Sequence, residues 1–449
     1  MLVSRGSRSA ALAACAVLLI STAACGGDDA EVSPTTQVRL YGTDGNMQNS
    51  FLQEFRKPAG LLDGMKGTTP LTPLSEDFQN RLLGIDANLS DYLYAAETYD
   101  AVAISALAAQ LAGSTTPAEI AKQINGVTNT GERCDAIRRC LQLARAGRDI
   151  EYRGISITRG GFTEAGEPST ASYATLHFGA NEQLDNGKTE FLGAGDESAA
   201  SAEAPPPAKR QADTSSAQSG APLKLGELLP RTGDLALAYP PMAAGAALAL
   251  REINAAGGVL GENVEWVEGD DGTNPQVAKA TVAEHVADKV HVIIGAGASG
   301  ISREVLPDVV AAGLILFSPS NTDAGLSTID DAGLYFRTAP SDLLQGRALA
   351  DVMLRDGADK IILVARKDSY GEGLQENVRA ELERAGHGSD RVKLLTYVPP
   401  DGADAPPVDF AAGAEEIKKY GAEAVLVIGF AESAQVIEAI VDAGVELRR

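Results

Sequence analysis

Short apolar runs alternate with longer amphipathic stretches over the second half of the chain. The apolar runs are continuous, which is typical of parallel strands that helices cover on both faces. The predicted strands are 223–230, 264–268, 290–295, 314–317, 360–364, 392–398 and 424–429, and the predicted helices include 241–254, 276–288, 344–355, 373–385 and 410–420. The pattern predicts an α/β fold with two parallel sheets, in a first lobe of about 222–342 and a second lobe of about 355–449.

Residues 37–195 follow a less regular pattern. Residues 38–46, VRLYGTDGN, predict a strand and a turn, and the Ala-rich segment 94–113 predicts a buried helix. Its polar residues and the absence of any other long apolar stretch argue against a membrane span. Further predictions are a short helix that begins at Thr116-Pro117, where proline suits the first helical position, and strands at 154–157 and 172–179.

The order of these segments is unusual. Residues 431–449 predict a helix and a connecting turn, and residues 38–46 predict the strand that should come next. Residues 223–230 have the pattern of an opening strand, although they stand halfway along the chain. Residues 196–221, rich in Ala, Ser and Pro, have no apolar period and predict a disordered linker. We therefore expect a circularly permuted protein in which the linker joins the original ends.

The N-terminal segment has the features of an export signal. Arg5 and Arg8 precede a short apolar run, and small residues precede Cys25. This ending resembles a bacterial lipobox, which predicts a signal peptide over residues 1–24 and lipidation of Cys25. Residues 25–36 would then form a tether, and the protein would be lipid-anchored on the extracytoplasmic face of the cell membrane.

The remaining cysteines and the composition limit the chemistry. Cys134 and Cys140 stay in the exported chain, where disulfides persist, and are predicted to be bonded. Two thiols cannot build a structural zinc site, and the four histidines show no ligand spacing, so we expect no metal and no cofactor. The net charge of −23 argues against nucleic acid and anionic lipid as partners.

Several segments resemble the type 1 periplasmic binding proteins, and among them the branched-chain amino acid and amide receptors of ABC importers. In the second half these segments are 228–261, 293–327, 335–351 and 367–374, and in the first half they are 42–52, 60–70, 94–113 and 134–157. The resemblance implies a two-lobed α/β fold whose ligand lies between lobes that close by hinge motion. It also implies swapped order, with the later part of the family in 37–195 and the earlier part in 222–449.

Three of the ligand-binding residues that the resemblance implies follow strands of the first lobe. Ser299 matches a serine whose hydroxyl and backbone N–H hold the α-carboxylate of the ligand. Thr322 matches a second hydroxyl donor, and Ser320 matches a backbone acceptor for the ammonium group. A serine after a strand is also the ordinary cap of a helix, so Ser299 has a purely structural alternative.

The other four residues come from different segments. Asp44, in GTDG, matches the acid that pairs with the α-ammonium group, although an Asp beside a Gly also suits a simple turn. Tyr370 and Phe430 match aromatic residues that cover the ligand, and Tyr239 lies where a side chain lines its variable end. A zwitterion needs donors at one end and a carboxylate at the other, so this set is chemically coherent.

An enzyme is a remote alternative. Residues 295–300 form a G-x-G-x-x-G between a strand and a helix, as in NAD-dependent oxidoreductases. That motif expects an acidic residue at the end of the next strand, and Leu316-Phe317-Ser318 supply none. Other common catalytic signatures are also absent, so we expect no enzymatic activity.

The sequence thus predicts a monomeric, extracytoplasmic solute-binding lipoprotein. It would capture a small amino acid or amide and deliver it to the permease of an ABC importer. Two alternatives keep the fold: a ligand sensor, or a fused pair of receptor fragments that completes itself only by domain swapping.

Overall fold

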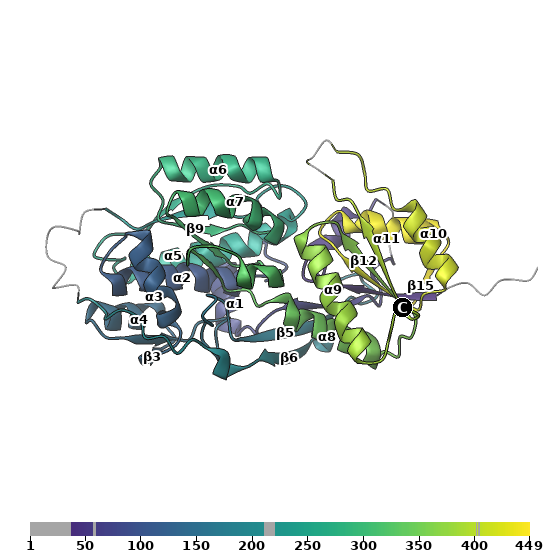
Figure 1. The fold of residues 1–449 in the computed structure, drawn as a ribbon, viewed down its shortest axis with the longest axis horizontal. Helices are drawn as coiled ribbons and strands as arrows, with labels where there is room; N and C mark the ends of the chain where they lie inside the picture. The colour runs from purple at the N-terminus through teal and green to yellow at the C-terminus, as the bar shows by residue number, and fades with distance from the viewer. Residues whose placement is uncertain (1–36, 57–59, 211–220, 401, 403–404) are drawn as a thin grey trace, which may run out of the picture. The chain divides into compact units, whose positions relative to one another are not determined.

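The computed structural model describes residues 37–56, 60–210, 221–400, 402 and 405–449 (Figure 1). The predicted signal peptide, the lipidated Cys25 and the tether of residues 25–36 lie outside the described residues, and so do residues 211–220 of the predicted linker. None of the described helices is long and apolar enough to cross a membrane.

A five-stranded parallel sheet is the centre of the first lobe. Its order is β11 (Tyr335–Arg337), β10 (Ile315–Ser318), β9 (Val292–Gly295), β7 (Lys224–Leu228) and β8 (Glu265–Val267). Every residue of β9 and β10 is buried. This burial explains why the sequence pattern is continuously apolar there, since helices cover both faces of the sheet.

The helices of this lobe come from both parts of the chain. α6 (Pro275–Ala287) and α7 (Ser299–Ala311) lie on one face, and α2 (Ala95–Ala112) and α3 (Pro117–Val127) lie on the other (Figure 1). α4 (Ile137–Arg145) and α5 (Tyr239–Ala255) pack against α2, and α1 (Glu76–Leu83) packs against α5. All residues of α2 are buried, as predicted for the Ala-rich segment, because it has neighbours on every side.

An eight-stranded mixed sheet is the centre of the second lobe. Its order is β13 (Val392–Tyr397), β12 (Ile361–Arg366), β14 (Ala424–Ile428), β1 (Gln37–Gly42), β2 (Lys66–Pro70), β5 (Thr170–His177) and β6 (Glu190–Gly195), with β15 (Glu446–Leu447) also paired to β1. β5 runs antiparallel to β2 and β6, and the other pairs are parallel. α8 (Asp342–Arg355) and α9 (Ser369–Arg384) pack on one face, and α10 (Ala411–Tyr420) and α11 (Ser433–Asp442) on the other. The short 3₁₀ helices are η1 (Asn49–Glu54), η2 (Asn186–Lys188), η3 (Glu197–Ala199), η5 (Ala236–Ala238) and η6 (Ala324–Thr328).

The β1 strand lies inside the second sheet, between a strand from the end of the chain and one from its beginning. Leu40 is paired with Val425 of β14, and Gly42 is paired with Gly67 of β2. The C-terminal β15 strand also reaches β1, where Arg448 N donates to Val38 O at 2.8 Å. The C-terminal segment and residues 38–42 are therefore neighbours in the second sheet.

The predicted disulfide is present. Cys134 and Cys140 are bonded, with their Cα atoms 5.5 Å apart. The bond joins α4 to β3 (Glu132–Cys134), which pairs in parallel with β4 (Ile150–Tyr152) as a separate two-stranded sheet.

The strand predicted at residues 154–157 is wrong. This segment has no ladder, and the backbone N–H groups of Ile155, Ser156 and Ile157 all donate to the carboxylate of Asp100 instead. The buried carboxylate of Asp100 therefore accepts from the backbone N–H groups that would otherwise donate to a neighbouring strand.

Part of the predicted linker differs from the expected disordered coil. Ser201 N donates to Phe162 O at 2.7 Å, and Lys209 N donates to Leu111 O at 2.9 Å. Gln123 Nε2 donates to the carbonyl of Pro206 at 2.9 Å. Hydrogen bonds to the first lobe thus hold this stretch in place although its composition gives no apolar period.

Candidate functional site

The carboxylate of Asp44 is held by side chains from three helical segments. It follows β1 in a turn and is buried. Gln345 Nε2 of α8 donates to it at 2.9 Å, Tyr94 OH at 2.8 Å and Tyr370 OH of α9 at 2.9 Å. Burial raises the pKa of Asp44, and these three hydrogen bonds oppose the rise. Because Tyr94 belongs to the first lobe and the others to the second, Asp44 lies where the lobes meet.

Tyr94 has a backbone conformation that is uncommon for a residue with a side chain. It immediately precedes α2 with a φ of 56°, in the left-handed region. Such a conformation persists where surrounding contacts hold it, and it is most common at functional sites. The contact here is the hydrogen bond from its hydroxyl to Asp44.

Tyr370 and Phe430 form one stacked group. Their ring centroids are 5.3 Å apart with an angle of 17° between the planes. The guanidinium of Arg366 lies 3.9 Å from the centroid of Phe430 and pairs with Glu432 at 2.8 Å and with Asp368 at 2.6 Å. The ion pairs hold Arg366 in place, and Arg366 in turn fixes the ring of Phe430.

The predicted residues of the first lobe form a second group. Ser299 Oγ accepts from the backbone N–H groups of Thr322 and Asp323 at 3.2 and 3.3 Å. Ser320 Oγ donates to Gly297 O at 2.8 Å. These bonds tie the loop that precedes α7 to the loop that follows β10, and both loops are buried.

The N-termini of α7 and α9 face each other across the two lobes. A Cβ added to Gly300 of α7 would lie 3.8 Å from Ser369 Oγ of α9. Ser369 Oγ is buried and has no hydrogen-bond partner among the described residues. Helix N-termini favour negative charge, so this position suits an anionic group. Ser369 was not predicted, because a serine at a helix start is ordinarily only a cap.

Asp342 lies between the two groups and was also not predicted. Its backbone N–H donates to Thr322 O at 2.7 Å. Neither of its carboxylate oxygens has a hydrogen-bond partner among the described residues. Burial and the charge of Asp44 raise its pKa well above the ordinary range, and the nearby Thr322 side chain opposes the rise. Sequence analysis passed over it because acids are common in the first turn of helices.

A further acceptor faces the same region. Gln345 Oε1 is buried without a partner among the described residues, while Gln345 Nε2 binds Asp44. The site therefore combines Asp44, Asp342 and Gln345 Oε1 as acceptors, and a ligand ammonium group would supply donors and a charge that favours the ionised form of the two acids.

The lobes contact each other directly beside the aromatic stack. Ala431 N donates to Asp234 O at 3.1 Å, and Arg366 lies 3.9 Å from the carboxylate of Asp234. Burial, followed by the charge of Glu432, raises the pKa of Asp234 to about 6.

Tyr239 belongs to a different group. Its ring lies under the guanidinium of Arg231, which is 5.4 Å from the ring centroid, and Arg231 pairs with Glu227. Burial raises the pKa of Tyr239 to about 12. The structure thus brings Asp44, Tyr370 and Phe430 together, joins Ser299, Ser320 and Thr322 in a second group, and places Tyr239 with Arg231. Among the described residues, no group of three His, Cys, Asp or Glu side chains could hold a metal ion.

The fold is a two-lobed α/β architecture with sheets flanked by helices. Residues 222–449 match the family model described as periplasmic binding protein. This match covers half of the chain, so the chain belongs to the periplasmic binding protein family, whose members bind ligands and are not enzymes. The family assignment agrees with the prediction that the G-x-G-x-x-G segment does not mark an oxidoreductase.

Curated relatives match part of the chain. It is 29% identical over 230 residues to "Leu/Ile/Val-binding protein homolog 3" of Brucella melitensis, a match that covers 50% of this chain and 60% of that protein. It is 31% identical over 209 residues to the "Leucine-, isoleucine-, valine-, threonine-, and alanine-binding protein" of Pseudomonas aeruginosa, which covers 46% and 54%. The chain therefore spans little more than half the length of these relatives.

A solved structure is also similar. The branched-chain amino acid transporter substrate-binding protein of Streptococcus pneumoniae, in complex with isoleucine, is 26% identical. The match has a TM-score of 0.42 and covers 51% of this chain and 63% of that one.

Proposed function

We propose that the protein captures a small amino acid or amide between its lobes outside the cytoplasm and delivers it to an ABC importer. The family assignment supports solute binding. The names of the relatives in Brucella melitensis and Pseudomonas aeruginosa support a small aliphatic amino acid as ligand.

The observation that carries this proposal is the buried excess of acceptors between the lobes. Both carboxylate oxygens of Asp342 are buried, and burial, followed by the charge of Asp44, raises its pKa well above the ordinary range, while the Thr322 side chain opposes the rise. Two neighbouring buried carboxyl groups, of which Asp44 accepts three hydrogen bonds, favour a cationic partner, because a buried charge without an opposite charge is costly. The ammonium group of an amino acid supplies that charge and three donors.

The opposite end of an amino acid also finds a complement. The N-termini of α7 and α9 converge near Gly300 and Ser369, and Ser299 lies in the same turn as Gly300. A ligand carboxylate there would accept from backbone N–H groups and from Ser369 Oγ. The stacked rings of Tyr370 and Phe430 provide an apolar surface for the side chain of the ligand.

The chain order is part of the proposal. We take the protein to be a circular permutant that completes its second lobe within one chain. The position of β1 between β14 and β2, and the pairing of β15 with the start of β1, support this arrangement. In this arrangement β1, β14 and β2 of one sheet come from the same chain.

Attachment to the membrane rests on the sequence. Cys25 follows small residues and an apolar run, so we propose that it carries a lipid and that the protein acts at the extracytoplasmic face of the membrane. Metabolic labelling with a radioactive fatty acid tests this: label is incorporated by the wild type and lost in Cys25→Ser.

Calorimetric titration tests the ligand class and the site together. Leucine, isoleucine, valine, threonine and alanine are compared with isovalerate, which lacks the ammonium group. We expect one or more amino acids to bind and isovalerate not to bind. Asp44→Asn should raise the Kd of the bound amino acid about 100-fold, because the ammonium group loses a buried charge partner.

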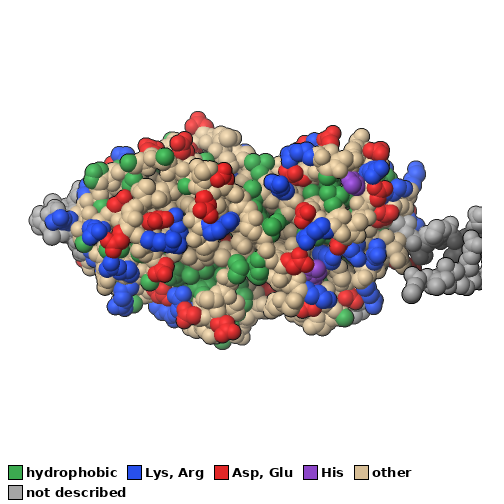
Figure 2. Space-filling model, turned by 90° about the horizontal axis from the view of Figure 1, so that it is seen from below, with side chains coloured by type: hydrophobic (Ala, Val, Ile, Leu, Met, Phe, Trp, Pro, Cys, Tyr) green, Lys and Arg blue, Asp and Glu red, His purple; other side chains and the backbone are tan. Residues whose placement is uncertain are grey.

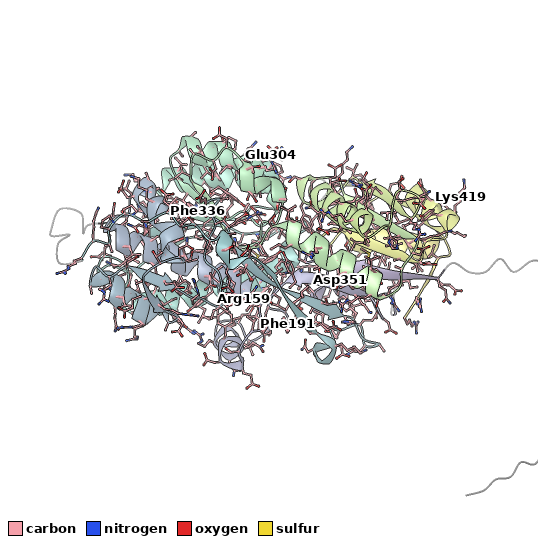
Figure 3. The ribbon with its side chains drawn as sticks, turned by 60° about the horizontal axis from the view of Figure 1, so that its bottom comes forward. Arg159, Phe191, Glu304, Phe336, Asp351 and Lys419 are labelled. Atoms are coloured by element: carbon pink, nitrogen blue, oxygen red, sulfur yellow. A yellow bond between two sulfur atoms is a disulfide. The ribbon has the colours of Figure 1, made fainter. Side chains whose placement is uncertain are left out.

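The matched control is Asp351→Asn, the same chemical change on the exposed face of α8 (Figure 3). It should leave the Kd unchanged. Equal binding of leucine and isovalerate, or an unchanged Kd in Asp44→Asn, would contradict the proposal.

A further inference from the structure

A cavity lies outside the group of predicted ligand-binding residues. It has a volume of about 340 Å³, within the range of small-molecule sites. Apolar side chains form much of its wall, among them Met47, Leu71, Leu176, Leu184 and Phe191. None of the seven predicted ligand-binding residues lines it.

The walls of the cavity come from both lobes. Met47 follows β1, Leu176 lies in β5 and Phe191 in β6, all in the second lobe, whereas Gln79 of α1 belongs to the first. Phe191 is labelled on β6 near the lower centre of Figure 3 and is 47% exposed, so it stands at the rim. Figure 2, seen from below, shows hydrophobic side chains at the surface near the middle of that face, between scattered charged groups.

Gln48 gives the cavity a specific polar feature. Its side chain is fully buried and lines the cavity, yet neither Nε2 nor Oε1 has a hydrogen-bond partner among the described residues. A buried primary amide without partners loses its bonds to water and gains none, so it is unfavourable. Its two donor hydrogens and its acceptor oxygen therefore have no partner among the described residues, at the wall of the cavity.

Neighbouring polar groups are already satisfied. Asn49 Nδ2 donates to Ser90 O at 3.0 Å, and its Oδ1 accepts from Leu184 N at 2.7 Å. Asp91 accepts from Asn49 N at 2.8 Å and from Ser90 Oγ at 2.8 Å. Gln48 is therefore left without partners next to groups that have theirs.

The charges of the lining define the ligand further. No Lys, Arg or His is among the described residues that line the cavity. Asp91 does line it. An anionic ligand would have no opposite charge and would lie near a carboxylate, so a neutral molecule fits better. A carboxamide matches Gln48, because each amide offers the other one donor and one acceptor.

We propose that this cavity is a second ligand site that takes a small neutral molecule with an apolar body and one carboxamide group. The carboxamide pairs with Gln48, and the apolar body lies against Leu71, Leu176 and Leu184. The cavity shares no predicted ligand-binding residue with the amino-acid site.

Thermal unfolding with benzamide as the probe tests this site. We expect saturating benzamide to raise the Tm of the wild type by about 2 °C. The shift should persist in Asp44→Asn, which alters only the site between the lobes. It should disappear in Leu71→Trp, whose indole fills the cavity.

Gln48→Leu is the second variant and tests the amide contact itself. It removes a buried polar group without partners, so the folded state is retained. The Kd of benzamide should rise at least tenfold, while the weaker binding of toluene, which lacks the amide, should not change. No shift in the wild type, or a shift that is lost in Asp44→Asn but kept in Leu71→Trp, would overturn the proposal.

Discussion

Asp100 and Glu97 lie one turn apart on the same buried helix, but their carboxylates differ in the hydrogen bonds that they accept. Asp100 accepts five hydrogen bonds, from Tyr152 OH, Ser156 Oγ and the backbone N–H groups of residues 155, 156 and 157. Glu97 Oε2 is buried without a partner among the described residues. Burial raises the pKa of Glu97 to about 8.

The difference separates an acid whose hydrogen bonds stabilise the fold from acids whose carboxylate oxygens can still accept hydrogen bonds from a partner. The donors of Asp100 hold the loop of residues 154–157, and Gly154 approaches so closely that an added Cβ would lie 2.1 Å from Asp100 Oδ1. Glu97 Oε2 and the carboxylate of Asp342 between the lobes have no comparable set of donors among the described residues. Buried polar groups normally find partners, so a shortage indicates where a ligand or a proton is taken up.

The largest effect should come from Asp100→Asn. The substitution replaces one acceptor oxygen by an NH₂ group, so buried donors of the 154–157 loop lose their acceptor. We expect the free energy of unfolding to fall by about 3 kcal/mol, as for other broken buried charge networks. Chemical denaturation measures this, with Asp351→Asn as the control. A loss below about 1 kcal/mol would remove the distinction between the two acids.

Glu97→Gln should change the pH dependence of stability. The pKa of Glu97 is about 8 in the folded protein, against an ordinary value of 4.5. Between these values the folded state binds more protons than the unfolded state, so stability falls as pH rises. The slope that Glu97 contributes is at most about 1.4 kcal/mol per pH unit, from pH 4.5 to 8.

Denaturation curves from pH 4.5 to 9 check this prediction. The Glu97→Gln variant should lose less stability over that range than the wild type and should be the more stable protein at pH 8. Burial also raises the pKa of Asp271, to about 7, so part of the slope should remain. If the stabilities of the variant and the wild type changed with pH in parallel, the Glu97 carboxylate would have a partner that stabilises its charge.

Local pattern predicted most of the sheets and helices, because buried parallel strands and amphipathic helices leave a direct mark on sequence. It failed at residues 154–157, where β-branched side chains suggested a strand. The acceptor that prevented the strand, Asp100, lies more than fifty residues earlier. Only the folded chain brings these segments together.

The candidate site residues were proposed from motif resemblance, which did not include their neighbours Asp342 and Ser369. The contact of Tyr370 with Phe430 and the hydrogen bond of Tyr370 to Asp44 join residues far apart in the chain. Asp342 and Ser369 stand at helix starts, where acids and serines are ordinary. What distinguishes them is a missing hydrogen-bond partner, which no sequence pattern records.

Tyr370→Phe should have the smallest effect on the free energy of unfolding. It tests whether the hydrogen bonds of Asp44 stabilise the fold as strongly as those of Asp100. The variant keeps the ring stacked on Phe430 but removes the hydroxyl that donates to Asp44 and lies 2.8 Å from Thr43 Oγ1. Asp44 keeps its bonds from Tyr94 and Gln345. We expect a loss of about 1 kcal/mol in the free energy of unfolding, typical of one hydrogen bond. A loss of about 3 kcal/mol, equal to that of Asp100→Asn, would instead make Asp44 an acid that organises the fold.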